Sequence, residues 1–114
     1  MTLPPLIITS AVHPSDQHVA LSSSEARVEH TLSAIGQWLQ LAPKLPIVLC
    51  DGSGFDFSPI IASRFPNGQI ECLAFLNDAA TVRLRGKGYG EGEIMRHALT
   101  NAKLLKDAPF FAKC

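Results

Sequence analysis

Residues 47–54 read IVLCDGSG, four apolar residues followed by an acidic, glycine-rich tetrapeptide. A short run without polar residues is typical of a strand that is covered on both faces, as in a parallel sheet. Aspartate and glycine favour turns, so the strand is expected to stop at Asp51. This stretch therefore predicts a buried strand that ends in a turn carrying one carboxylate.

Strand-like and helix-like segments alternate on both sides of this stretch. The β-branched run at residues 6–10 predicts a strand, and apolar residues spaced three or four apart predict a long helix that ends before Pro43. A second long helix is expected after the glycine-rich residues 86–92. The remaining expected elements are a short helical or irregular piece at 58–64, a strand at 70–76 and the start of another strand at 110–112.

Helices between buried strands, with connections long enough to cross over, imply a parallel sheet. We expect an α/β protein with a three-layer α/β/α sandwich around a short, mostly parallel, Rossmann-like sheet, in one domain over residues 1–114. Ligands of such sheets bind beyond the carboxyl ends of the strands. The segments 9–14, 51–54 and 86–92 are therefore expected to open on one edge of the sheet.

The composition excludes several classes of partner and location. The 114 residues carry ten basic and ten acidic side chains, so no overall positive field favours nucleic acid. The longest apolar runs are far shorter than the roughly 20 residues of a membrane-spanning helix. The N-terminus lacks a basic region followed by an apolar one, so secretion is not indicated. We expect a cytoplasmic protein, with peripheral association with a membrane as the second option.

Cysteine and histidine spacing predicts no metal site. The three cysteines have no short pair spacing, and the four histidines form no ligand motif. Cys50 and Cys72 are interpreted as buried free thiols on strands, and Cys114 as a free thiol near the end of the sequence.

Residues 86–92 are the most unusual segment, because every second residue is glycine. Glycine lets backbone N–H groups approach a phosphate, and Arg85 and Lys87 supply positive charge. Glu91 and Glu93 stand where a dinucleotide-binding motif needs glycine, and no Ser or Thr follows Lys87 as a Walker A loop requires. Two interpretations stay open: a pocket loop with Arg85 or Lys87 facing a ligand, or a surface loop before a helix whose first turn contains both glutamates.

Asp51, Arg27 and Ser53 each allow more than one interpretation. The Asp51 carboxylate either accepts hydrogen bonds from a base or ribose, or bonds its own backbone in an Asx-turn. Arg27 is either a solvated helix residue or a polar anchor for a loop or ligand. A hydrolase that uses Ser53 ranks last, because the G-x-S-x-G elbow is absent.

Four stretches together resemble the N-terminal part of GT-A type glycosyltransferases of bacterial capsule and lipopolysaccharide synthesis: ITS at 8–10, EARVEHTLSAI at 25–35, IVLCDGS at 47–53 and GKGYGEGEI at 86–94. The resemblance implies binding of a nucleoside diphosphate sugar, with base and ribose near the first two strands and the diphosphate near the glycine-rich segment. The site residues it implies are Thr9, Ser10, Asp51, Gly52, Arg85, Lys87, Gly88 and Gly90.

The resemblance covers nearly the whole chain, but as the first half of a larger domain. The metal-binding acidic motif of the family would follow the strand that begins near Phe110, and the acceptor-binding half is absent. The resemblance therefore assigns no catalytic residue and no metal ligand, and a divalent metal is expected in a complete family member. The expected partners are a nucleotide sugar, a saccharide acceptor, and a second copy or a missing half of the domain. The alternative function is a non-catalytic α/β interaction module that pairs through an exposed sheet edge.

Overall fold

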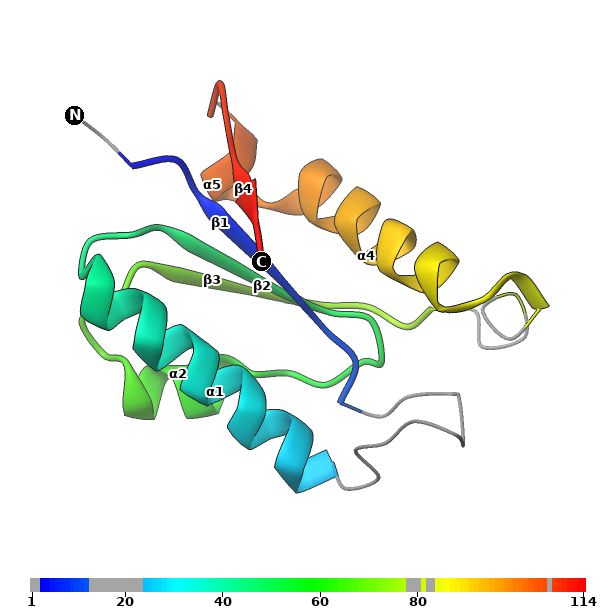
Figure 1. Cartoon of the computed structure of the whole chain (residues 1–114), viewed down its shortest axis with the longest axis horizontal. Helices are drawn as coiled ribbons and strands as arrows, with labels where there is room; N and C mark the ends of the chain where they lie inside the picture. The colour runs from blue at the N-terminus through cyan, green and yellow to red at the C-terminus, as the bar shows by residue number, and fades with distance from the viewer. Residues whose placement is uncertain (1–2, 13–23, 78–80, 82–83, 107) are drawn as a thin grey trace.

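The computed structural model describes residues 3–12, 24–77, 81, 84–106 and 108–114 (Figure 1). Among these residues, no helix combines the length and the apolar character needed to cross a membrane. The elements along the chain are β1 (Leu6–Ser10), α1 (Ser24–Leu41), β2 (Ile47–Asp51), α2 (Ser58–Arg64), β3 (Ile70–Ala74), α4 (Lys87–Asn101), α5 (Lys103–Lys106) and β4 (Ala112–Lys113).

The four strands form one parallel sheet in the order β3-β2-β1-β4. Leu6 pairs with Ile47 and Ser10 with Asp51, so β1 and β2 end side by side. The chain steps outward from β1 to β3 and then returns, through α4 and α5, to the other side of β1. The predicted parallel α/β sheet is confirmed, and the two central strands begin where the sequence pattern placed them.

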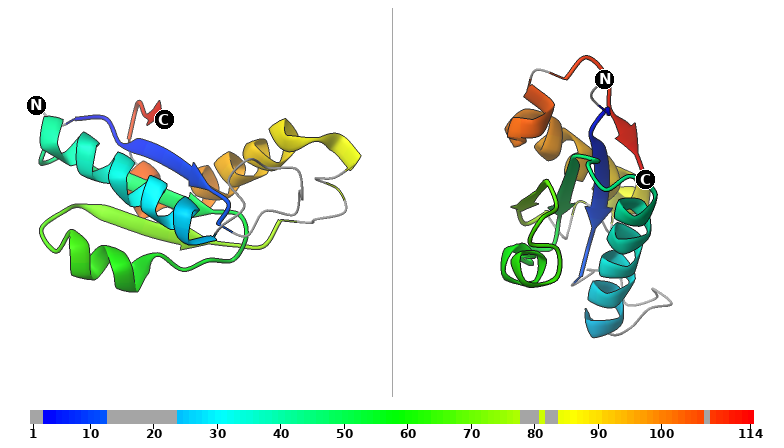
Figure 2. Two further views of the ribbon diagram at one scale, coloured as in Figure 1. Left: turned by 60° about the horizontal axis from the view of Figure 1, so that its bottom comes forward. Right: turned by 90° about the vertical axis from the view of Figure 1, so that its left-hand side faces the viewer.

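Hydrophobic clusters lie on both faces of the sheet, because alternate strand residues point to opposite sides (Figure 2). Leu6 and Ile8 pack with α1 and α2, whereas Ile7 packs with α4 and α5. The apolar stripes expected from helical spacing supply both clusters. Buried members of these stripes are Leu32 and Ile35 on one side and Ile94, Ala98, Ala102 and Leu105 on the other.

The glycine-rich segment differs from its prediction as a loop. Helix α4 begins at Lys87, so the alternating glycines up to Gly92 lie within its first two turns. Gly86 precedes the helix with a φ of 96°, a conformation that favours glycine. Glu91 therefore stands in the second turn rather than the first. Glycine is a poor helix former, by about 1 kcal/mol relative to alanine, but packing against the sheet outweighs such propensities.

Candidate functional site

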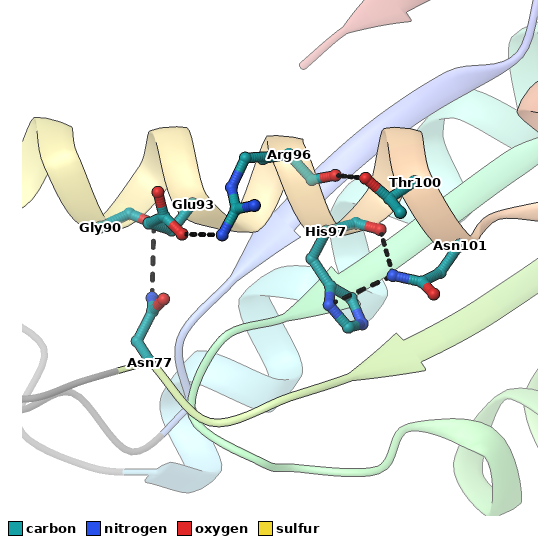
Figure 3. Close-up of polar contacts among 7 residues, drawn as sticks. All are labelled: Asn77, Gly90, Glu93, Arg96, His97, Thr100 and Asn101. Carbon is teal, nitrogen blue, oxygen red and sulfur yellow. Dashed lines mark hydrogen bonds and ion pairs between the residues drawn. The ribbon is translucent and has the colours of Figure 1, made fainter.

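The carboxyl ends of β1 and β2 and the start of α4 meet at one edge of the sheet (Figure 1). Asn77, three residues beyond β3, connects them. Its backbone N–H donates to the Gly52 carbonyl oxygen at 2.9 Å, and its side-chain Nδ2 donates to the Gly90 carbonyl oxygen at 3.3 Å (Figure 3). The expectation of a common edge is confirmed for residues 9–12, 51–54 and 86–92. Residues 13 and 14 lie outside the described part of the chain.

Asp51 is fully buried at this edge and its carboxylate accepts five hydrogen bonds. Oδ2 accepts from the Ser10 hydroxyl at 2.9 Å and from the Val12 N–H at 3.0 Å. Oδ1 accepts from the N–H and the hydroxyl of Ser53 at 2.7 and 2.6 Å, and from the Phe55 N–H at 3.1 Å. Such charge-assisted bonds compensate for the burial of the carboxylate and hold the two loops together.

The Asx-turn interpretation of Asp51 is therefore confirmed, since its side chain bonds the backbone two residues later. Both carboxylate oxygens are engaged within the protein. In this conformation the Asp51 carboxylate positions Ser10 and Val12 at the end of β1. The Ser53 hydroxyl serves the same turn.

Gly52 is a point of close approach between the end of β2 and α4. A Cβ atom built there would lie 2.7 Å from Ile94 Cγ1 and 2.8 Å from Asn77 Nδ2. A glycine is needed at this position because these atoms leave no space for a side chain. Gly52 is buried, and the absence of a side chain lets α4 pack closely onto the edge of the sheet.

Residues 87–92 lie in α4 and not in the predicted loop. Arg85 is exposed and its guanidinium lies 5.5 Å from the centre of the Tyr89 ring. Gly88 is exposed, and Gly90 is buried with its carbonyl oxygen bonded to Asn77. Lys87 is the first residue of α4, and its side chain lies outside the described part of the structure.

Glu91 links three elements at this edge, which the sequence pattern did not indicate. The Thr9 hydroxyl of β1 lies 3.5 Å from Glu91 Oε1, and the Lys113 ammonium of β4 forms an ion pair with the same oxygen. Thr9 and Glu91 are 82 residues apart in the sequence, so no local motif predicts their contact. Glu91 therefore connects α4 to the carboxyl end of β1 rather than capping its own helix.

A polar pocket of about 180 Å³ lies beside the carboxyl end of β1. One wall comes from residues 9–11 and the other from α1. Arg27 Nη1 donates to the Ala11 carbonyl oxygen at 3.3 Å, which confirms the interpretation of Arg27 as a polar anchor for this loop. The lining residues are Thr9, Ser10, Ala11, Arg27, His30 and Thr31.

Sequence reasoning missed His30 and Thr31 as site residues. They follow Arg27 by three and four positions, a spacing that places all three on one side of a helix. The apolar stripe of α1 occupies the other side. The polar residues at positions 27, 30 and 31 on one side of this helix were the signal that could have identified His30 and Thr31.

The cysteine thiols do not supply a nucleophile on the strands. Burial and, to a smaller extent, the neighbouring Asp51 carboxylate together raise the pKa of the Cys50 thiol to about 12. Burial likewise raises the pKa of Cys72 to about 11. The thiols of Cys50 and Cys72 are free, as predicted, although only Cys50 is fully buried, and Cys114 is free and exposed.

Two further observations complete the description of the site. Within the described ranges, no group of three or more His, Cys, Asp or Glu side chains is placed to hold a metal ion. No family model matches the chain, and neither a curated protein nor a solved structure is significantly similar to it. The interpretation of the site therefore depends on its geometry and chemistry.

Proposed function

We propose that this chain is a glycosyltransferase-like domain that binds a nucleoside diphosphate sugar at the carboxyl edge of its sheet, for transfer to a saccharide acceptor of a surface polysaccharide. The proposed setting is the cytoplasm or the cytoplasmic surface of a membrane, and the proposed architecture is a three-layer, Rossmann-like sandwich. No residue is assigned a catalytic role. The proposal concerns the donor-binding half of the reaction.

The observation that carries the proposal is the polar pocket at the carboxyl end of β1. The strand order turns back at β1, because β2 and β3 lie on one side of it and β4 on the other. Open parallel sheets bind ligands at such a reversal, in the crevice outside the carboxyl ends of the strands. The position of the pocket and the topology of the sheet thus support the same ligand site independently.

The chemistry of the edge also supports a nucleotide sugar. Departure of a nucleoside diphosphate leaves negative charge, which a transferase must neutralise with cations or a metal. Arg27 places a guanidinium at the pocket. Thr9 and Ser10, which the resemblance implies as site residues, line the pocket from β1, and Asp51 holds Ser10 and Val12 in position.

Thermal unfolding with a panel of uridine, cytidine, guanosine and thymidine diphosphate sugars tests this function. A ligand at 100 times its dissociation constant stabilises the native state by about 2.7 kcal/mol, and for a chain of this size that raises Tm by about ten degrees or more. We expect one class of donor to produce this rise and Thr9→Val to reduce it.

Thr100→Val is the matched control, because the Thr100 hydroxyl bonds the Arg96 carbonyl oxygen on the exposed side of α4 (Figure 3). This variant should respond to the donor like the unmodified chain. The absence of a rise with every donor in the panel, at concentrations up to several millimolar, would refute the proposed function.

An interaction module is the second candidate function, supported by the exposed residues beside β4. Phe110 and Phe111 are 75% and 44% exposed, and Ala112 and Lys113 form an exposed edge strand. Edge strands and exposed aromatic residues favour pairing with another chain. Sedimentation velocity over a range of concentrations tests this candidate: dimerisation that Phe110→Ser reduces supports it, and a monomer at all concentrations contradicts self-association.

A further inference from the structure

The volume of the pocket limits how much of a ligand it can enclose. At about 180 Å³ it is smaller than the roughly 300–1,000 Å³ of pockets that enclose drug-sized ligands. If the proposed function is correct, on which this inference rests, the pocket holds one group of the nucleotide sugar while the rest lies along the sheet edge. The candidates for that group are the base, the ribose, the sugar and the diphosphate.

The charges of the lining residues distinguish among these groups. Arg27 carries a permanent positive charge, His30 contributes an imidazole, and none of the six lining residues within the described part of the chain is acidic. Two carboxylates described above contact lining residues: that of Asp51 bonds Ser10 and accepts five hydrogen bonds from the protein, and that of Glu91 contacts the Thr9 hydroxyl and pairs with Lys113. The pocket therefore favours a negatively charged group.

The hydrogen-bond donors of the pocket lead to the same choice. The Ser10 hydroxyl donates to Asp51 at 2.9 Å and the Thr31 hydroxyl to the Arg27 carbonyl oxygen at 3.0 Å, so neither hydrogen is directed to a ligand. The other donor groups among the described lining residues are the guanidinium of Arg27, whose Nη1 also donates to the Ala11 carbonyl oxygen at 3.3 Å, and the imidazole of His30. A guanidinium matches the geometry of phosphate oxygens better than that of uncharged hydroxyl groups.

We infer that this pocket binds a phosphate group of the ligand through Arg27 and His30, so that the diphosphate lies against α1 rather than against Lys87 at the start of α4. This orientation is opposite to the one that the glycine-rich segment suggested. The first turns of α4 then lie near the other end of the ligand.

Titration calorimetry with inorganic pyrophosphate at low ionic strength tests this inference on the intact chain. Arg27→Gln is expected to weaken pyrophosphate binding roughly tenfold or more, because it removes hydrogen bonds to a charged group. His30→Gln should weaken it about two- to fivefold, because His30 is exposed and water competes for its contacts. Arg27→Lys should restore part of the affinity, which separates loss of charge from loosening of the Ala11 loop.

Two matched controls accompany these variants. Arg64→Gln removes an exposed arginine of α2 that pairs with Glu29 of α1, the helix that carries Arg27, and it should leave pyrophosphate affinity unchanged. Lys87→Gln tests the opposite orientation and should also leave it unchanged. Circular dichroism and urea unfolding of each variant confirm that the fold is retained before affinities are compared.

The results separate this inference from the proposed function. The inference is overturned if pyrophosphate does not bind, or if Lys87→Gln weakens binding while Arg27→Gln and His30→Gln do not. Binding of a nucleotide sugar that these two variants leave unchanged also overturns it, but supports the proposed function. Pyrophosphate binding that depends on Arg27, without tighter binding of any nucleoside diphosphate sugar, supports the phosphate pocket and contradicts the proposed function.

Discussion

The turn after β2 and the start of α4 lie at the same sheet edge and both carry alternating glycines, but different forces hold them. The turn is organised around Asp51, which is 0% exposed and bonds the backbone of three other residues. At the start of α4, a Cβ atom added at Gly88 or Gly92 would meet no atom within 4 Å. A buried carboxylate can hold a loop in one conformation through its hydrogen bonds. Gly88 and Gly92 have no side chain that could do so, and they adopt the helical conformation of α4.

The turn after β2 and the start of α4 also contribute to the candidate site in different ways. The turn positions Ser10 and Val12 beside the pocket and has no open carboxylate oxygen of its own. The start of α4 is exposed and contacts the rest of the edge through Gly90 and Glu91. Disruption of the turn should therefore affect the whole fold, and disruption of the helix start should affect mainly local stability.

Replacement of Asp51 should give the largest effect on stability. Asp51→Ala removes the carboxylate that accepts from the buried N–H of Val12 and the half-buried N–H groups of Ser53 and Phe55, and we expect a loss of about 3–5 kcal/mol in the free energy of unfolding. Urea denaturation measures the loss. The control is Asp56→Ala, which removes an exposed carboxylate that accepts from the Ser58 N–H at 2.9 Å, and its effect on stability should be much smaller. Equal losses in the two variants would show that the buried carboxylate of Asp51 stabilises the fold no more than the exposed carboxylate of Asp56.

Replacement of Gly52 should have the next largest effect. Gly52→Ala forces Ile94 or Asn77 to move from a Cβ atom that would lie within 3 Å of both, at an expected cost of about 1–3 kcal/mol. A double-mutant cycle with Ile94→Ala checks the cause, because the cost of Gly52→Ala should fall when the Ile94 side chain is absent. Additive effects would show that the close approach to α4 is not what requires glycine.

Two replacements within the glycine-rich segment should have opposite effects on the stability of the folded chain. Gly88→Ala is expected to stabilise the chain by about 0.5–1 kcal/mol, because Gly88 is in a helix and its Cβ would meet open space. Gly86→Ala should destabilise it by about 1–3 kcal/mol, because φ is 96° there. Thermal unfolding measures both changes. Destabilisation by Gly88→Ala would indicate a loop rather than a helix at this position.

The thiols of Cys50 and Cys72 should be inert at neutral pH. Each has a pKa raised from 9.0, to about 12 and about 11, so the stability that their protonated state contributes is complete below pH 9 and is lost as pH rises toward those values. An aromatic disulfide reagent at pH 7.5 should label Cys114 rapidly and the other two after unfolding. Cys114→Ser should abolish the fast phase, and fast labelling of Cys50 would show that the end of β2 is open.

The positions of the strands and the apolar stripes followed from the sequence, because a strand or a helix repeats its apolar residues with a local period. This period located β1, β2 and the buried faces of α1 and α4. The predicted length of β3 was two residues too long. The strand ends at Ala74, and Leu76 forms an antiparallel bridge with Ser53. The glycine spacing near Lys87 was also misinterpreted, because local propensity underestimates packing with distant residues.

The composition of the site was decided by contacts between segments far apart in the chain. Whether Asp51 faces a ligand or the protein depends on Ser10 and Val12, which reach it from β1. The pocket joins β1 to a polar side of α1, and Glu91 meets Thr9 across 82 residues. Local periodicity carries no information on such pairs, since a side chain's partners depend on which surfaces the folded sheet brings together.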